Sequence, residues 1–82
     1  MVENILKLFV EKGFLLDKEI VDFIRELDDE QLAHEIITKI AILSHKKLIT
    51  KHLVNEYIER IKPLLIELDG EKKKLVNKYF VN

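Results

Sequence analysis

The chain has 82 residues, which suits a single small domain, and its formal net charge is −1. Thirty residues are Ile, Leu or Val, and none is Cys. The aliphatic content excludes intrinsic disorder, and the lack of cysteine excludes a disulfide scaffold and a thiolate metal site. No apolar run approaches the ~18 residues of a membrane helix, so we expect a cytoplasmic domain with no membrane partner.

Helical periodicity predicts four helices. The first covers Val2–Lys12 and ends at Gly13, a residue type that favours the left-handed conformation after a helix. The second follows Asp17, which has the side chain of a good N-cap. Its apolar face contains Ile20, Phe23, Ile24 and Leu27.

The third helix begins after Asp28 or Asp29, either of which can cap it. Its main apolar stripe is widened by two further residues, so we expect this helix to be central and the most buried. The stripe comprises Leu32, Ile36, Ile40 and Leu43, and the widening residues are Ala33 and Ile37.

The fourth helix follows Thr50 as its N-cap, and Pro63 interrupts its pattern. Either the helix kinks at Pro63, or it stops near Ile61 and a short turn restarts there. Asp69 and Gly70 indicate a turn. We therefore assign residues 1–68 to one helical domain and residues 69–82 to a C-terminal tail or the start of a linker. A last helical turn at Lys72–Lys78 is the alternative, because Leu75, Val76, Tyr79 and Phe80 have helical spacing, although β-type residues close the chain.

Two short apolar segments do not fit a helix, and they carry an internal repeat. Residues 15–21 (LLDKEIV) match residues 48–54 (LITKHLV) position for position, 33 residues apart. Each unit is an extended apolar pair followed directly by a capped helix, and two such pairs side by side predict a tiny parallel ladder. The expected fold is mainly α: a compact four-helix bundle with two very short parallel strands, in the order helix-strand-helix-helix-strand-helix.

The residues that most often carry chemistry form no recognisable active site. His34, His45 and His52 are spaced 11 and 7 residues apart on different elements, which does not match a zinc site. The acids at 28–30 lack the alternating ligands of a calcium loop and are better explained as helix caps. Ser44 is not part of a motif that activates a serine nucleophile. The sequence contains no glycine-rich phosphate-binding loop. We therefore expect no catalytic residue, no cofactor and no metal.

Lysines gather in two places in the second half of the chain. Residues 1–43 carry a net charge of −5 and residues 44–82 a net charge of +4. The first cluster surrounds the start of the fourth helix, where positive charge favours a phosphate or an acidic peptide. It contains His45, Lys46, Lys47, Lys51 and His52, and the second cluster contains Lys72, Lys73, Lys74 and Lys78. A solvated lysine-rich surface is the alternative interpretation for both.

A helix-turn-helix is a further alternative, because about two residues join the second and third helices. A recognition helix usually presents Arg, Asn or Gln to base edges. The acids at 28–30 begin the third helix and would repel phosphates. The sequence therefore disfavours DNA reading by this helix.

Residues 6–61 resemble the N-terminal domain of the small subunit of archaeal family-D DNA polymerase. The resemblance rests on an opening helix ending in Lys12-Gly13, then Phe14 and the segment LLDKEIV, a long middle helix, and Lys47-Leu48-Ile49-Thr50 before Leu53-Val54. It implies similarity to the N-terminal domain of the second subunit of eukaryotic polymerase epsilon, and a fold like the lid domain of AAA+ ATPases. In this family the parent subunit also carries an oligonucleotide-binding fold and a 3′–5′ exonuclease domain, and it pairs with a large polymerase subunit.

The resemblance implies a non-catalytic interaction domain that docks a replicative polymerase to the replisome, with the large subunit or a GINS protein as partner. Candidate partner-binding residues are Phe14, Lys46, Lys47, Lys51 and His52. The edge of the strand pair, at residues 14–16 or 47–49, is the expected acceptor for a partner strand. Two alternatives remain: a nucleic-acid-binding domain that uses Lys46, Lys47, Lys51 and Lys72–Lys74, and a self-associating helical module.

Overall fold

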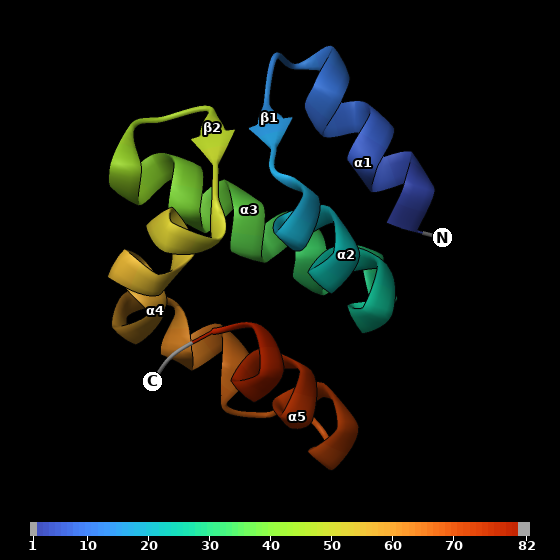
Figure 1. The fold of residues 1–82 in the computed structure, drawn as a ribbon, viewed down its shortest axis with the longest axis vertical. Helices are drawn as coiled ribbons and strands as arrows, with labels where there is room; N and C mark the ends of the chain where they lie inside the picture. The colour runs from blue at the N-terminus through green and yellow to red at the C-terminus, as the bar shows by residue number, and fades with distance from the viewer. Residues whose placement is uncertain (1, 81–82) are drawn as a thin grey trace.

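The computed structural model describes residues 2–80, which form five helices and one two-stranded sheet (Figure 1). The elements in chain order are α1 (Val2–Glu11), β1 (Leu15–Leu16), α2 (Lys18–Leu27), α3 (Glu30–Ser44), β2 (Leu48–Ile49), α4 (Lys51–Leu65) and α5 (Gly70–Tyr79). The mainly helical class and the two short parallel strands are thus confirmed.

The strand pair has the register that the internal repeat predicts. Leu15 lies opposite Leu48 and Leu16 lies opposite Ile49, an offset of 33 residues at both positions. Leu16 and Ile49 face the interior, and Ile49 is fully buried. The repeat is therefore structural: each copy contributes one strand, one N-cap and one helix to the same side of the molecule.

The helix boundaries follow from local chemistry. Gly13 adopts φ +86° after α1, as its position predicts, and the side chains of Asp17, Asp29, Thr50 and Asp69 each accept a backbone N–H at the start of a helix. Helix α4 continues through Pro63 to Leu65 and does not stop near Ile61.

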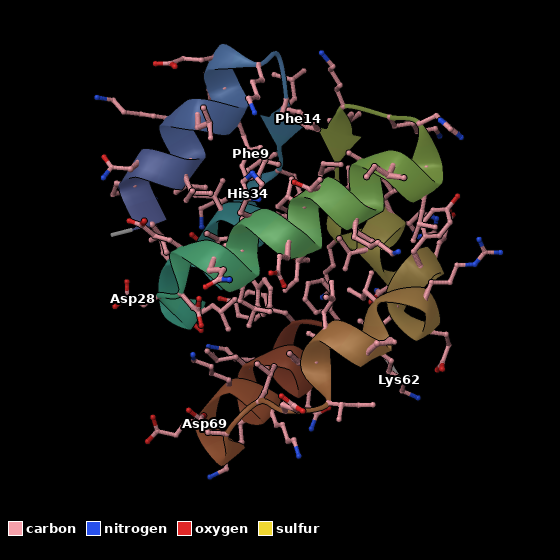
Figure 2. All side chains as sticks on the ribbon, turned by 180° about the vertical axis from the view of Figure 1, so that it is seen from behind. Phe9, Phe14, Asp28, His34, Lys62 and Asp69 are labelled. Atoms are coloured by element: carbon pink, nitrogen blue, oxygen red, sulfur yellow. The ribbon has the colours of Figure 1, made fainter. Side chains whose placement is uncertain are left out.

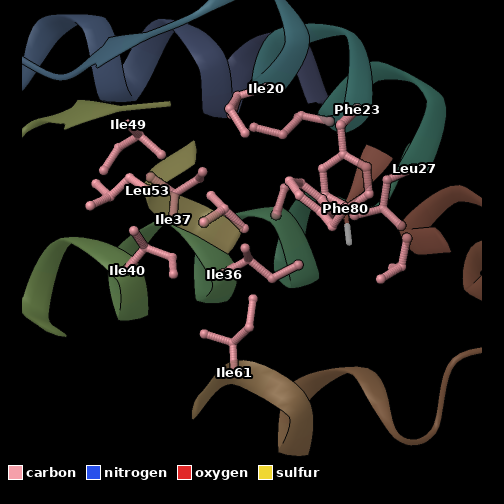
Figure 3. Packing of buried hydrophobic residues seen from close by; sticks show 14 of the residues in the cluster. Ile20, Phe23, Leu27, Ile36, Ile37, Ile40, Ile49, Leu53, Ile61 and Phe80 are labelled. Atoms are coloured by element: carbon pink, nitrogen blue, oxygen red, sulfur yellow. The ribbon is translucent and has the colours of Figure 1, made fainter. Parts of the chain in front are cut away.

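The core lies between the helices, and α3 runs through its middle. Ala33, Ile36, Ile37 and Ile40 of α3 are at most 2% exposed, whereas Leu32 and Leu43 of the predicted stripe are only partly buried. Figure 3 shows side chains from several elements around α3. Those it labels are Ile20, Phe23, Leu27, Ile36, Ile37, Ile40, Ile49, Leu53, Ile61 and Phe80.

Helix α5 corrects the prediction of four helices. It lies beside α4 and packs against α2 (Figure 1), and its Val76, with Phe80 directly after it, belongs to the buried core. The rings of Phe80 and Phe23 meet edge to face at 4.9 Å. Residues 70–80, assigned above to a tail or linker, are therefore helix and core, while 81–82 lie outside the described residues.

Candidate functional site

The structure separates the first predicted basic cluster into two places. Lys46 and Lys47 lie in the turn between α3 and β2, beside Phe14, and help to line a groove. Lys51 and His52 lie in the first turn of α4 and are not among the residues of that groove. The five candidate residues therefore do not form one continuous site.

The N-terminus of α4 already holds an anionic side chain. The carboxylate of Asp17 accepts two backbone N–H groups: Oδ1 accepts Ile20 N–H of α2 at 2.9 Å, and Oδ2 accepts Lys51 N–H of α4 at 3.0 Å. Thr50 Oγ1 accepts a third N–H, from Leu53, at 3.0 Å. Asp17 thus takes the position that a bound phosphate would favour at this helix end.

The side chains in the first turn of α4 also have acidic neighbours. Lys51 Nζ lies 3.2 Å from Glu19 Oε2, and His52 Nε2 lies 2.9 Å from Glu56 Oε1. Both pairs are exposed and therefore contribute little to stability, but they reduce the positive charge that this surface presents to a partner.

The second lysine cluster is partly neutralised in the same way. Lys72 Nζ donates to Asp29 Oδ2 at 2.9 Å, and Lys78 Nζ lies 3.3 Å from Glu26 Oε1. The backbone N–H of Leu32 and then the Lys72 ammonium lower the pKa of Asp29. Lysines of the basic second half of the chain thus form ion pairs with carboxylates of the acidic first half.

A groove opens between the C-terminal ends of α1 and α3, at the turns that lead into the two strands. Its volume is about 330 Å³. Phe9 forms its floor and is 2% exposed. The centre of the Phe9 ring lies 5.4 Å from that of Phe14, in an edge-to-face contact, and 5.7 Å from that of His34, in a stacked contact. Figure 2 shows these three side chains together between α1 and α3. Ile42, 62% exposed, completes the apolar lining.

The rim of this groove is cationic. Lys12 comes from the α1 side and His45 and Lys46 from the α3 side, while no Asp or Glu lines the groove. Lys47 Nζ donates to the Lys12 carbonyl oxygen at 3.0 Å and lies 5.7 Å from the centre of the Phe14 ring. Within residues 2–80, the ammonium groups of Lys12 and Lys46 have no carboxylate partner.

The predicted strand edge is only partly available. Phe14 N–H donates to the Phe9 carbonyl at 2.8 Å, and the Lys47 carbonyl accepts from Leu15 N–H at 2.9 Å. Both backbone groups are therefore used inside the fold. The side chains of Leu15 and Leu48 lie opposite each other in the ladder and are 66% and 53% exposed.

A second groove lies between α4 and α5. Its volume is about 390 Å³ and its lining includes Leu65, Val76 and Ile66, the last 67% exposed. Two lysines border it: Lys62 pairs with Glu59 at 3.1 Å, whereas Lys73 has no carboxylate partner in the described range. This groove is apolar too, but it has fewer unpaired cations around it.

Sequence reasoning missed two residues of this groove. Lys12 is far from Lys46 in the chain, and Ile42 lies on a helix that was expected to be buried. The repeat contained a signal for Lys12, because the 33-residue offset aligns Lys12 with His45 and Phe14 with Lys47. Both copies of the turn before a strand thus contribute to the same groove.

The three histidines do not converge. His34 stacks on Phe9, His45 is the left-handed residue that ends α3, and His52 pairs with Glu56. Among residues 2–80, no group of three or more His, Cys, Asp or Glu side chains is placed to hold a metal ion. No helix in this range is both long and apolar enough to cross a membrane.

A scan against protein-family models, a search of curated proteins and a search of solved structures found no match to this chain.

Proposed function

We propose that this chain is a non-catalytic protein-docking domain and that the groove between α1 and α3 is its docking site. One observation carries the proposal. The fold pairs Lys51, Lys72 and Lys78 with carboxylates, yet within residues 2–80 Lys12 and Lys46 have no carboxylate partner and lie beside an apolar groove. Apolar recesses with a charged rim are typical of surfaces that bind proteins.

The resemblance to the small subunit of family-D polymerase supports a more specific role. On that basis the domain docks a replicative DNA polymerase to the replisome, and its partner is the large polymerase subunit or a GINS protein. The same resemblance implies an architecture like the lid domain of AAA+ ATPases. That likeness implies no ATPase activity, because the chain has no phosphate-binding loop.

Nucleic-acid binding is the second candidate, and Lys73 and Lys74 on α5, which have no carboxylate partner among residues 2–80, favour it. Three observations count against it. Lys51 and Lys72 have carboxylate partners, Phe9 is buried, and Phe14 is covered by Phe9 and Lys47, so the groove offers no open aromatic face for base stacking. Binding of nucleic acid through lysines falls steeply with salt.

Pull-down of purified large subunit and purified GINS by the full chain tests the proposal. The matched variants are Ile42→Asp in the proposed groove and Ile66→Asp in the second groove, since both side chains are more than 60% exposed. We expect the wild-type chain and Ile66→Asp to capture a partner and Ile42→Asp to lose it. Capture of neither protein by the wild-type chain refutes the replisome role, and loss in Ile66→Asp alone moves the site to α4 and α5.

A further inference from the structure

We infer that the groove binds an acidic segment of a partner protein that carries one large apolar side chain, with carboxylates on both sides of that side chain. The inference rests on the proposed docking function and adds the chemistry of the partner. It follows from the shape of the groove, the charge of its rim and the contacts of its lysines.

The floor of the groove selects an apolar group. The half-buried Phe14 and the 62% exposed Ile42 line a space of about 330 Å³ whose base is the buried Phe9, and this volume is at the lower end of the range for ligand pockets, roughly 300–1,000 Å³. A space of this size suits one large side chain and its neighbouring backbone. A phenylalanine or leucine there gains the free energy of apolar burial, whereas an alanine leaves most of the groove in water.

The rim selects negative charge on both sides of that apolar group. Lys12 directly follows α1 and Lys46 lies in the turn after α3, so the two ammonium groups border the groove from the ends of two helices. Among the described residues, no carboxylate lines the space. Charge complementarity therefore favours a segment with Asp or Glu before and after the apolar residue.

Complementation of helix C-termini explains only one of these lysines. Lysines near such ends often interact with the last carbonyl groups. Lys47 does so, because its ammonium donates to the Lys12 carbonyl at 3.0 Å. No acceptor is recorded for the ammonium of Lys12 or Lys46 within residues 2–80, so these two remain available to a partner.

Three synthetic peptides of equal length test this chemistry by titration into the isotope-labelled full chain. The first has acidic residues around a central phenylalanine, the second replaces that phenylalanine with alanine, and the third keeps the phenylalanine but replaces the acids with lysine. We expect the first peptide to shift the amide signals of Phe14, Ile42 and Lys46. Loss of the aromatic ring should weaken binding by about tenfold or more, since burying such a side chain is worth roughly 1.5–3 kcal/mol. The lysine peptide should not bind.

Two charge-matched variants locate the acidic part of the recognition. Lys12→Glu/Lys46→Glu reverses the rim, and Lys73→Glu/Lys74→Glu reverses two lysines of α5 that also have no carboxylate partner in the described range. Both double variants change the net charge equally. We expect the rim variant to weaken the first peptide by about tenfold or more and the α5 variant to change it less than about twofold.

Equal binding of the phenylalanine and alanine peptides overturns the inference, as does an equal effect of the two double variants. Displacement of the peptide by single-stranded DNA at similar concentration, or peptide binding that only tracks self-association in sedimentation, also overturns it. The proposed function fails separately: if the pull-down shows Ile42-dependent capture but the peptides show no preference, only the partner chemistry is wrong. If the peptides behave as expected and neither replication protein is captured, the groove chemistry stands and the replisome role falls.

Discussion

Replacing Asp17 with alanine removes two hydrogen bonds, one that caps α2 within the first copy of the repeat and one that joins this copy to the second. The carboxylate accepts Ile20 N–H at the start of α2 and Lys51 N–H at the start of α4, at 2.9 and 3.0 Å. Loss of an N-cap costs about 1 kcal/mol, and loss of a second, charge-assisted bond at this half-buried position adds about 1–2 kcal/mol. We expect Asp17→Ala to lower the free energy of unfolding by about 2–3 kcal/mol in total.

The matched substitution is Thr50→Ala, which removes the equivalent cap of α4 and only one bond, to Leu53 N–H. It should cost about 1 kcal/mol. Asp17→Asn should fall between the two, because its amide oxygen still caps α2 while its NH₂ group faces Lys51 N–H as a second donor. Urea unfolding of the four proteins measures the differences. The reasoning is refuted if Asp17→Ala costs no more than Thr50→Ala.

Three further predictions concern other positions. Asp28→Gly should raise the free energy of unfolding by about 1 kcal/mol in urea titrations, because Asp28 ends α2 at φ 49° and glycine adopts this region without strain; a loss of stability would contradict this. Phe80→Ala should lower the free energy of unfolding by about 3 kcal/mol, because Phe80 is 5% exposed and its ring packs on that of Phe23. An unchanged free energy of unfolding in the same assay would mean that α5 does not contribute to the core. The pKa of Asp29 is lowered in the fold by Leu32 N–H and Lys72, so its stabilisation is present above pH about 4 and disappears as the pH falls through the lowered value. The stability gap between wild type and Asp29→Asn should therefore shrink between pH 6 and pH about 3, and a gap that widens would be inconsistent with it.

The parts of the fold that depend on local chemistry were predictable from the sequence. Gly13 and the caps Asp17 and Thr50 act on backbone groups a few residues away, so their positions identify helix ends. The strand register was predictable because the repeat places both strands at the same distance before their caps.

The helix at the C-terminal end was not predictable in the same way. Helix α5 is rich in lysine, and its apolar residues with helical spacing begin only at Leu75, so the sequence pattern was too short to distinguish a helix from a tail. Its stability comes from distant contacts, above all the packing of Val76 and Phe80 into the core and the edge-to-face contact of the Phe80 and Phe23 rings. Such contacts appear only when the chain is folded.

The candidate site was half predictable for a related reason. Closeness in sequence grouped Lys46, Lys47, Lys51 and His52, but β2 and the start of α4 carry the last two away from the groove. Lys12 joins the groove from the other copy of the repeat. Glu19 neutralises Lys51 only because the fold brings the two side chains together. The other ion pairs between the two halves of the chain also depend on tertiary structure, so composition does not predict them.

Calorimetric titration of the replication protein captured in the pull-down, against the full chain and its two charge-matched double variants, tests the docking groove most directly. The account predicts that Lys12→Glu/Lys46→Glu weakens binding by about tenfold or more while Lys73→Glu/Lys74→Glu leaves it within about twofold of wild type. An equal loss in both variants, or a loss confined to the α5 variant, would show that the groove between α1 and α3 is not where this domain binds its partner.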